Sequence, residues 1–285
     1  MTRPTAQLRS MLASGRLVVA PFVWDGFGAR AAEHAGCHAV YMTGFGTAAA
    51  RGFPDVGLLT MSEMVQNAAY IAQAVQVPVI ADADTGYGNP INVTRTVREY
   101  ERAGVAAIHI EDQVWPKKCG FLEGKRVIPA EEMVAKVKAA LAARTDPDFV
   151  IIARTDAYAP LGWDEAMRRA RLYHRAGADL VFVDGIRTVD ELRRYAADLA
   201  GIPKLYNGGL LPAKEIEALG FNVQIVGGTL AAIHEAYRRA FAELVQHGTI
   251  TPGLHDPRFD FDGLTDLLRL PAIRALERQF AVEEA

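Results

Sequence analysis

Cysteine is scarce in this chain, since only Cys37 and Cys119 occur among its 285 residues. Two cysteines cannot build the disulfide framework that supports many small secreted domains. No apolar run is long enough to span a bilayer, and the N-terminal segment lacks the apolar core of a signal peptide. We therefore expect a reduced, cytoplasmic protein.

A concentrated positive surface is also missing, because the formal net charge is -3 and Lys and Arg form no dense run. Nucleic acids and anionic membranes are bound through such clusters. We therefore expect a small-molecule partner, with no nucleic acid and no membrane. Half of the residues are apolar, which is ample for one large core.

Eight short apolar runs alternate with segments of helical periodicity. The runs are LVVAPF, AVYMTG, PVIADA, AAIHI, FVIIAR, LVFVDG, PKLYNG and VQIVGG, and the helical segments are 62–76, 92–103, 130–143, 164–176, 189–199 and 230–246. Closure of eight such units removes the sheet edges, so the pattern predicts an α/β protein with a (β/α)8 TIM barrel. A doubly wound open sheet is the alternative, although the first strand-to-helix turn has no G-x-G-x-x-G motif.

The repeat stops near residue 248, so we expect a catalytic barrel domain over residues 1–248. A connector, TPGLHDPRFDFDG, then leads to a helical stretch over 264–280, in which Pro271 predicts a kink. This stretch has an apolar stripe made of Leu264, Leu267, Leu268, Ile273, Leu276 and Phe280. A stripe that follows a complete barrel needs a cover, from its own barrel or from another subunit.

Acidic residues follow two neighbouring predicted strands. Asp82 and Asp84 are two residues apart on an extended strand, so both side chains should leave the same face, close to Glu111 at the next strand end. Carboxylate oxygens suit a hard divalent ion such as Mg2+, whereas zinc would call for His or Cys. The alternative is that these acids only solvate strand ends. His109, within the same strand as Glu111, is expected to be buried.

Two further strand ends offer groups that bind anions. Arg154 is placed for a fork-like contact with a substrate carboxylate, or alternatively for a salt bridge to a rim acid. Thr43 and the backbone of Gly44 to Gly46 offer hydroxyl and N-H donors without bulky side chains, although glycines are common at strand ends.

Residues 113–129 show neither a helical nor an alternating period, which predicts a long loop that acts as a lid. Cys119 lies in this loop beside Lys117 and Lys118, and nearby cations lower the pKa of a thiol. Such a thiol can give or take a proton, whereas the alternative is an incidental loop cysteine. Cys37 follows a helix in an apolar context and is expected to serve packing.

Four segments together match a known pattern. YMTGFGTAAARGFPDVG, ADADTGYGNP, IHIEDQVWPKKCG and IIARTDAYA resemble, in order and spacing, the signature segments of the isocitrate lyase and phosphoenolpyruvate mutase superfamily, in its 2-methylisocitrate lyase-like branch. The similarity runs from about residue 17 to residue 246. It implies a Mg2+-dependent enzyme, with Mn2+ as the alternative ion, that forms a homotetramer and swaps a C-terminal helix between subunits.

The resemblance also implies roles for individual residues. Metal binding falls to Asp82 and Asp84, supported by Asp55 and Glu111. The catalytic group comprises Lys117, Cys119, Arg154 and Glu111, with Cys119 on a gating loop as the acid that protonates the departing carbanion. The substrate-binding group comprises Thr43, Gly44, Phe45, Gly120, Arg154, Asp184 and Asn207.

The chain departs from this pattern at the residues that would bind the far end of the substrate. The lyases have His where this chain has Phe121, and Glu where it has Asp184. The segment after Asn207 is shorter, and the arginine expected after the eighth strand has no counterpart in GGTLAA. The exact substrate is therefore left open.

These features predict a lyase that breaks a carbon-carbon bond in a small 2-hydroxy or 2-oxo dicarboxylate. Hydrolysis or decarboxylation of oxaloacetate, and carbon-phosphorus chemistry on carboxyphosphonoenolpyruvate or phosphonopyruvate, are the alternatives within the superfamily. A catalytically silent homologue that binds carboxylates is the alternative of a different class.

Overall fold

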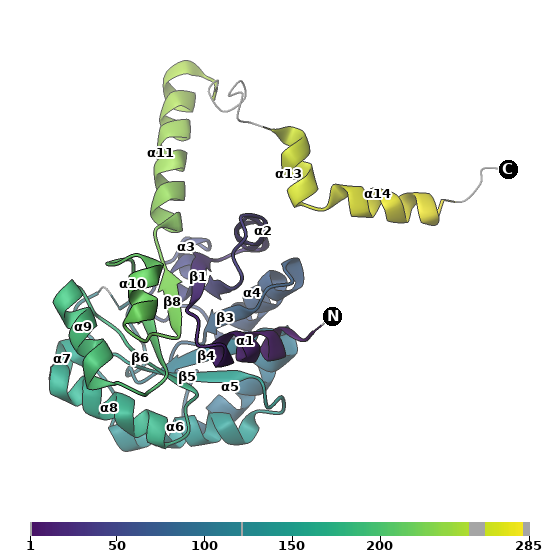
Figure 1. Cartoon of the computed structure of the whole chain (residues 1–285). Helices are drawn as coiled ribbons and strands as arrows, with labels where there is room; N and C mark the ends of the chain where they lie inside the picture. The colour runs from purple at the N-terminus through teal and green to yellow at the C-terminus, as the bar shows by residue number, and fades with distance from the viewer. Residues whose placement is uncertain (1, 121, 251–259, 282–285) are drawn as a thin grey trace. The chain divides into compact units, whose positions relative to one another are not determined.

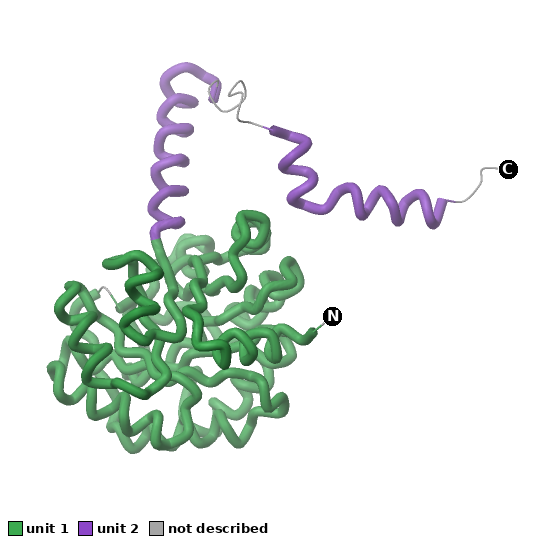
Figure 2. Tube along the Cα trace, viewed as in Figure 1, with its two compact units in different colours: residues 1–227 green, residues 228–285 purple. Residues whose placement is uncertain are grey.

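The computed structural model describes residues 2–120, 122–250 and 260–281. The chain separates into two compact units, Met1–Gly227 and Gly228–Ala285 (Figure 2). All eight strands lie in the first unit. The helix that spans 229–247 belongs by its contacts to the second unit, and the predicted domain boundary at residue 248 stays a prediction.

Eight parallel strands form a closed barrel in chain order (Figure 1). Val18 pairs with Val223, which joins the last strand to the first. The strands are β1 (Val18–Val23), β2 (Val40–Met42), β3 (Val79–Asp82), β4 (Ala107–Glu111), β5 (Val150–Thr155), β6 (Leu180–Val183), β7 (Lys204–Asn207) and β8 (Val223–Val226). Each overlaps one of the apolar runs, so the prediction of a (β/α)8 TIM barrel is confirmed.

Helices surround these strands in the first unit (Figure 1). They are α1 (Pro4–Ala13), α2 (Gly26–His34), α3 (Gly44–Ala49), α4 (Met61–Ala74), α5 (Pro90–Ala103), α6 (Ala130–Ala143), α7 (Tyr158–Leu161), α8 (Trp163–Arg175), α9 (Val189–Asp198) and α10 (Ala213–Ala218). The long helices α4, α5, α6, α8 and α9 coincide with predicted segments. The short helices α3, α7 and α10 have too few turns to produce a periodic pattern.

Local signals set the ends of the long helices. Thr60 and Glu63 form a capping box at the start of α4, in which the Thr60 backbone N-H donates to Glu63 Oε2 at 2.7 Å. Asn89 caps α5 in the same way, just before a proline at its first position. Gly104 ends α5 with a φ of 87°, a left-handed conformation that glycine adopts without strain.

Alternation along the strands separates two apolar layers. In β2, Val40 and Met42 pack with residues of the surrounding helices, whereas Tyr41 packs inside the barrel with Ile80 and Phe182. Successive strand residues point to opposite faces, so each strand contributes to both layers. This packing holds the carboxyl ends of the strands rigidly in one ring, where sites in this fold are built.

The second unit contains three helices in its described part: α11 (Thr229–His247), α13 (Phe261–Leu267) and α14 (Leu270–Gln279). None of their described residues is buried. The stretch predicted as one helix kinked at Pro271 is two helices, because the chain turns at Arg269, whose φ is 62°. Pro271 lies in the first turn of α14, where its missing N-H costs nothing. The predicted connector lies largely outside the described residues.

The predicted apolar stripe of this stretch is exposed to solvent. Ile273 and Leu276 are 51% and 48% exposed, and Phe280 is 71% exposed. Within the described residues, no helix combines the length and apolarity needed to cross a membrane.

Candidate active site

Charged side chains gather at the carboxyl ends of β3, β4, β5 and β6, and they form two groups. The lysine cluster comprises Lys117, Asp55 and Asp84. The arginine cluster comprises Arg154, Lys125, Glu111, Asp156 and Asp184. Strand register brings these ends together, because Asp82 pairs with His109 and Glu111 pairs with Arg154 across neighbouring strands.

In the lysine cluster, the ammonium of Lys117 lies between two carboxylates. Its Nζ donates a hydrogen bond to Asp55 Oδ1 and lies 2.8 Å from Asp84 Oδ1. All three side chains are buried, so the loop that carries Lys117 is folded down onto the strand ends. Burial acts to lower the pKa of Lys117, yet the surrounding carboxylates, Asp84 foremost, raise it well above its usual range and keep the ammonium charged.

Asp82 and Asp84 are close together, although not by the predicted route. β3 ends at Asp82, and Asp84 lies in the following turn with a φ of 48°, not on an extended strand. The turn closes because the Asp84 backbone N-H donates to Asp82 Oδ1 at 2.9 Å. Asp is one of the few residues other than glycine that tolerates this left-handed conformation, so the turn aims the second carboxylate without a glycine.

Gly44 lets the main chain approach both carboxylates closely. A Cβ added to this glycine would lie 2.6 Å from Asp82 Oδ2 and 3.6 Å from Asp84 Oδ1. The Gly44 backbone N-H donates to Asp82 Oδ2 at 3.2 Å, so this donor already serves the acid. Thr43, at the same strand end, caps α3, accepting from the Gly46 N-H at 3.4 Å.

In the arginine cluster, the guanidinium of Arg154 contacts three carboxylates. Its Nε and Nη2 donate to the two oxygens of Asp156 at 2.8 and 2.9 Å. Its Nε lies 3.3 Å from Glu111 Oε2, and its Nη2 lies 3.3 Å from Asp184 Oδ2. Two roles were predicted for Arg154, a substrate contact or a salt bridge to a rim acid. The contacts in this structure are salt bridges to rim acids.

Burial and charge shift the acids in different directions. Burial raises the pKa of Asp84 to about 6, although Lys117 opposes the shift. Burial raises the pKa of Glu111 well above its usual range, with Arg154 in opposition. Burial acts the same way on Asp156, but Arg154 and Lys125 outweigh it and lower its pKa to about 2. Asp84 and Glu111 therefore bind protons more readily than Asp156.

The donor set fits a hard divalent cation. Glu111 Oε1 is buried and, among the described residues, accepts no hydrogen bond, whereas the buried Asp84 Oδ1 is paired with the Lys117 ammonium at 2.8 Å. A buried carboxylate oxygen with unused acceptor capacity, close to other buried acids, suits a cation with oxygen ligands. No three His, Cys, Asp or Glu side chains of the described residues are arranged to hold an ion by themselves. Mg2+ needs only one or two protein carboxylates, because waters complete its shell.

The predicted lid is ordered against both clusters over its described residues, 113–120 and 122–129. The Cys119 backbone N-H donates to Asp55 O at 3.0 Å, and the half-buried thiol lies on this segment. Lys125 Nζ donates to Gly120 O at 2.8 Å. Gly120 lies against the arginine cluster so closely that an added Cβ would be 2.1 Å from Asp184 Oδ2. Phe121, the departure from the lyase loop, lies outside the described residues.

Two predicted substrate residues stand apart from these groups. Phe45 is 46% exposed on α3, and Asn207 is half-buried at the end of β7. Among the residues that the structure describes, no hydrogen bond or ion pair joins either side chain to the two clusters. Asp184, the substrate-binding residue predicted at the end of β6, does belong to the arginine cluster.

Three residues that contact the site were not predicted as site residues from the sequence: Asp156, Lys125 and His109. Asp156 directly follows β5, two residues after Arg154, and the Arg-Thr-Asp sequence at this strand end carried a signal for it. Lys125 is within the loop and no periodic signal marks it. His109 was expected to be buried, and it is, but nothing in the sequence indicated that Tyr41 Oη lies 2.7 Å from its Nε2, which in turn lies 3.6 Å from Asp82 Oδ1.

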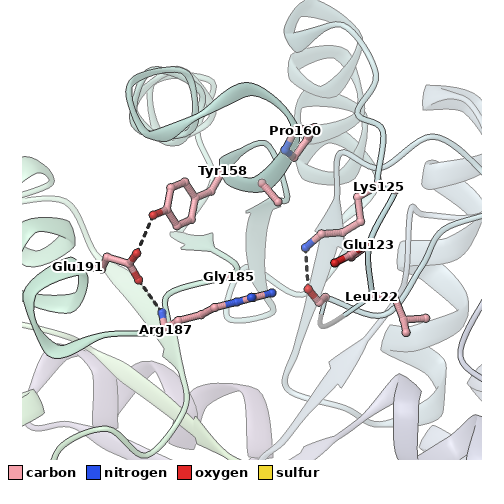
Figure 3. A pocket seen from close by; sticks show the side chains of 11 residues that line it. Leu122, Glu123, Lys125, Tyr158, Pro160, Gly185, Arg187 and Glu191 are labelled. Carbon is pink, nitrogen blue, oxygen red and sulfur yellow. Dashed lines mark hydrogen bonds between the residues drawn. The ribbon is translucent and has the colours of Figure 1, made fainter.

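A pocket of about 540 Å³ adjoins the lid, lined by residues 120, 122–125, 158–160, 185, 187 and 191. On one wall, Glu191 accepts hydrogen bonds from Tyr158 Oη and the Arg187 backbone N-H, each at 2.7 Å (Figure 3). Lys125 reaches in from the opposite wall (Figure 3). None of the three acids Asp82, Asp84 and Glu111 lines this pocket.

A closed parallel barrel with charged side chains at the carboxyl ends of its strands defines the (β/α)8 class, in which enzyme active sites occupy this end. Residues 8–245 match the family model described as phosphoenolpyruvate phosphomutase. The chain belongs to this family, within the isocitrate lyase and phosphoenolpyruvate mutase superfamily, and the predicted resemblance is confirmed.

Its relatives include lyases. The chain is 45% identical over 285 residues to the 2,3-dimethylmalate lyase of Eubacterium barkeri, covering 97% of this chain and 98% of the relative. It is 41% identical over 255 residues to the 2-methylisocitrate lyase of Aeropyrum pernix, covering 87% and 82%.

Solved structures with the same fold include hydrolases. An oxaloacetate acetylhydrolase in complex with 3,3-difluorooxalacetate superposes with a TM-score of 0.92 at 37% identity, covering 97% of both chains. A phosphonopyruvate hydrolase in complex with oxalate and Mg2+ gives a TM-score of 0.89 at 33% identity, covering 98% of this chain and 99% of the other. The alternatives named from the sequence are thus represented among the structural neighbours.

His109 generates a prediction about stability and pH. Burial lowers its pKa to about 4, below the usual 6.5, so the unfolded chain binds this proton more readily. The stability that neutral His109 contributes is complete above about pH 6.5 and is lost as pH falls toward 4. Between pH 7 and pH 5 we expect it to cost roughly 2 kcal/mol of the unfolding free energy.

Urea unfolding of wild type and of His109→Gln at both pH values measures this difference, because other titrating groups act equally in the two proteins. His234→Gln, at an exposed position on α11, serves as the control. A His109→Gln protein with the same pH dependence as wild type would contradict the assignment.

Proposed function

We propose that this protein is a Mg2+-dependent lyase that cleaves a carbon-carbon bond in a small 2-hydroxy or 2-oxo dicarboxylate, as its lyase relatives' names suggest. The observation that carries the proposal is the lid, whose Lys117 pairs with Asp55 and Asp84 and whose Cys119 backbone N-H donates to Asp55 O. A lyase of this kind needs a charged site that excludes water and holds a proton donor near the breaking bond.

Asp82 and Asp84 would hold the divalent cation, with Asp55 and Glu111 supporting it partly through water. Mg2+ suits this all-oxygen set, and Mn2+ is the alternative ion. When bound, the ion would stabilise the negative charge that develops on the substrate oxygens during cleavage. Lys117 now balances the same acids, so we expect its ammonium to shift toward the substrate when the ion binds.

Arg154 would bind a substrate carboxylate through its planar guanidinium, exchanging contacts with Glu111 or Asp184 for contacts with the ligand. Thr43, Gly44, Phe45 and Gly120 would line the same carboxylate site, with Asp184 and Asn207 toward the far end of the substrate. Arg154 already has a partly open geometry, since two of its three acid contacts are at 3.3 Å while Asp156 holds it bidentately.

Cys119 would protonate the carbanion that leaves after cleavage. Its backbone is tied to Asp55 and its segment passes over Arg154, so the lid delivers the thiol together with Lys117. Lid closure would also protect the carbanion from water.

Hydrolysis, the reaction that the names of the oxaloacetate and phosphonopyruvate enzymes give, is the second candidate, with a metal-activated water as the nucleophile. Hydrolysis is favoured by two departures from the lyase pattern, Phe in place of His at position 121 and Asp in place of Glu at position 184. A catalytically silent homologue is the candidate of another class. A screen of 2-hydroxy acids, 2-oxo acids and phosphonates with Mg2+, with keto-acid release as the readout, separates all three.

We further propose a cytoplasmic homotetramer in which the C-terminal helices are exchanged between subunits, with residues 1–248 as the catalytic domain. The exposed stripe of α13 and α14 supports a cover from a second copy, because Leu268, Ile273 and Leu276 are about half exposed in the single chain.

Asp84→Ala is expected to abolish Mg2+-dependent turnover, because it removes one of the two carboxylates proposed to hold the ion. Titration of activity with Mg2+ measures this loss. Asp190→Ala, which removes a fully exposed carboxylate on α9, serves as the control. Full turnover with unchanged metal dependence in Asp84→Ala would refute the metal site.

Cys119→Ser is expected to keep substrate affinity and to lose turnover by roughly 10²- to 10⁴-fold, the usual contribution of a general acid. The matched control is Cys37→Ser, which changes the other thiol of the chain. Steady-state kcat and KM on the true substrate provide the test. Wild-type turnover in Cys119→Ser would exclude the lyase mechanism and favour hydrolysis.

A chain that ends at Gly263 is expected to form a smaller assembly than the full-length protein, because it lacks the exposed stripe of α14. Sedimentation velocity of both proteins measures the change. A chain that ends at Ala281 retains both helices and should match the full-length protein. An unchanged assembly in the shorter chain would count against helix exchange.

A further inference from the structure

We propose that Lys125 is a positioning residue that leaves Arg154 available for an anionic substrate and latches the closed lid onto the site. The substrate part of this inference rests on the proposed function, whereas the latch part does not. Lys125 is absent from every role assigned above, and it belongs to the same buried cluster as the substrate-binding arginine.

The ammonium of Lys125 has three oxygen neighbours. It donates to Asp156 Oδ1 at 3.0 Å and to Gly120 O at 2.8 Å, and it lies 3.4 Å from Asp184 Oδ2. Its side chain is only 3% exposed. Placing a lysine there costs desolvation unless its partners are all engaged, so the three contacts define one position for the ammonium.

Two of these partners are shared with Arg154. Asp156 and Asp184 each contact both cations, and Glu111 is a third acid on Arg154. Without Lys125, Asp156 and Asp184 would bear on the guanidinium alone, and the cluster would lose one positive charge against the same acids. A guanidinium that is already overcompensated attracts a substrate carboxylate less, because the like charges of the acids repel the ligand.

The third partner is the backbone of the lid. Gly120 follows Cys119 directly, and an added Cβ at Gly120 would lie 3.1 Å from Arg154 Nη2. Lys125 lies in the same loop, so its hydrogen bond to Gly120 O braces the loop, while its ion pairs with Asp156 and Asp184 hold the loop at the arginine cluster. Lys117 holds the preceding part of the lid at Asp55 and Asp84. The two lysines fasten the lid on either side of Cys119.

One side chain thus joins two events that catalysis needs together. When the lid closes, Lys125 comes down with it, and its ammonium pairs with Asp156 and Asp184 while donating to Gly120 O. When the lid opens, Lys125 leaves with it, and the two acids lose that positive charge. Closure and the charge balance around Arg154 are therefore coupled through Lys125.

Three variants test this. Lys125→Met removes the charge and the donor, Lys125→Arg keeps the charge with altered donor geometry, and Arg126→Met removes a charge from the adjacent exposed side chain as a matched control. Hydrogen exchange of the 113–129 peptide without ligand reports on the latch. Binding of oxalate in the presence of Mg2+, by calorimetry, and kcat and KM on a substrate found in the screen report on the charge balance.

We expect Lys125→Met to exchange its lid amides at least 10-fold faster, to bind oxalate at least 10-fold more weakly and to raise KM more than it lowers kcat. Lys125→Arg should recover most of the oxalate affinity, and Arg126→Met should match wild type in every measurement. Wild-type lid exchange in Lys125→Met would overturn the latch. Wild-type oxalate affinity in Lys125→Met, or no recovery in Lys125→Arg, would overturn the charge role.

The design keeps the two proposals apart. Failure of wild type to turn over any compound in the screen would refute the proposed function, while the lid exchange would still decide the latch. A purely structural role would lower the melting temperature of Lys125→Met without changing KM relative to kcat, and that outcome would overturn the inference. If Lys125→Met does not fold, the exchange rate and oxalate affinity of Lys125→Arg decide it: loss of oxalate affinity in this folded, charged variant overturns the inference.

Discussion

Compensation of buried negative charge is the constraint on which the site depends. Five carboxylates at the strand ends are at most 5% exposed: Asp82, Asp84, Glu111, Asp156 and Asp184. A buried carboxylate without a partner costs on the order of several kcal/mol. The barrel itself supplies one cation, Arg154, and the lid supplies Lys117 and Lys125. The folded lid therefore neutralises part of the negative charge at the strand ends, and its ion pairs with these acids hold it in place.

Much of the fold could be predicted from the sequence, because apolar runs and helical spacing report burial directly. All eight strands and the long helices of the barrel follow from these patterns. The break at Arg269 could not be predicted, because a non-glycine residue in a left-handed conformation leaves no compositional mark, whereas Pro271 offered a visible but misplaced signal. Short helices such as α3 lack the turns that make a period visible.

The site was predictable only where residues occur at strand ends. Asp82, Glu111 and Arg154 were found by that rule, and the conclusion that Asp84 joins them was right in proximity although its extended-strand premise was wrong. The contacts of Lys125 could not be predicted, because they form only when the loop folds back across the ends of two strands. The link from Tyr41 through His109 to Asp82 was hidden for the same reason: it joins three strands, and no single segment contains it.

The close approach of Gly120 to Asp184 limits the space between the lid and the arginine cluster. At this point the wall is bare main chain, with the position of a Cβ already taken by a carboxylate oxygen. No side chain at residue 120 can be trimmed to admit a bulkier compound, and none can be added without lifting the lid. Aspartate is one methylene shorter than glutamate, and a longer acid at residue 184 would reach the volume that the Gly120 main chain fills. The length of the acid that follows β6 therefore limits how closely the lid can approach the arginine cluster.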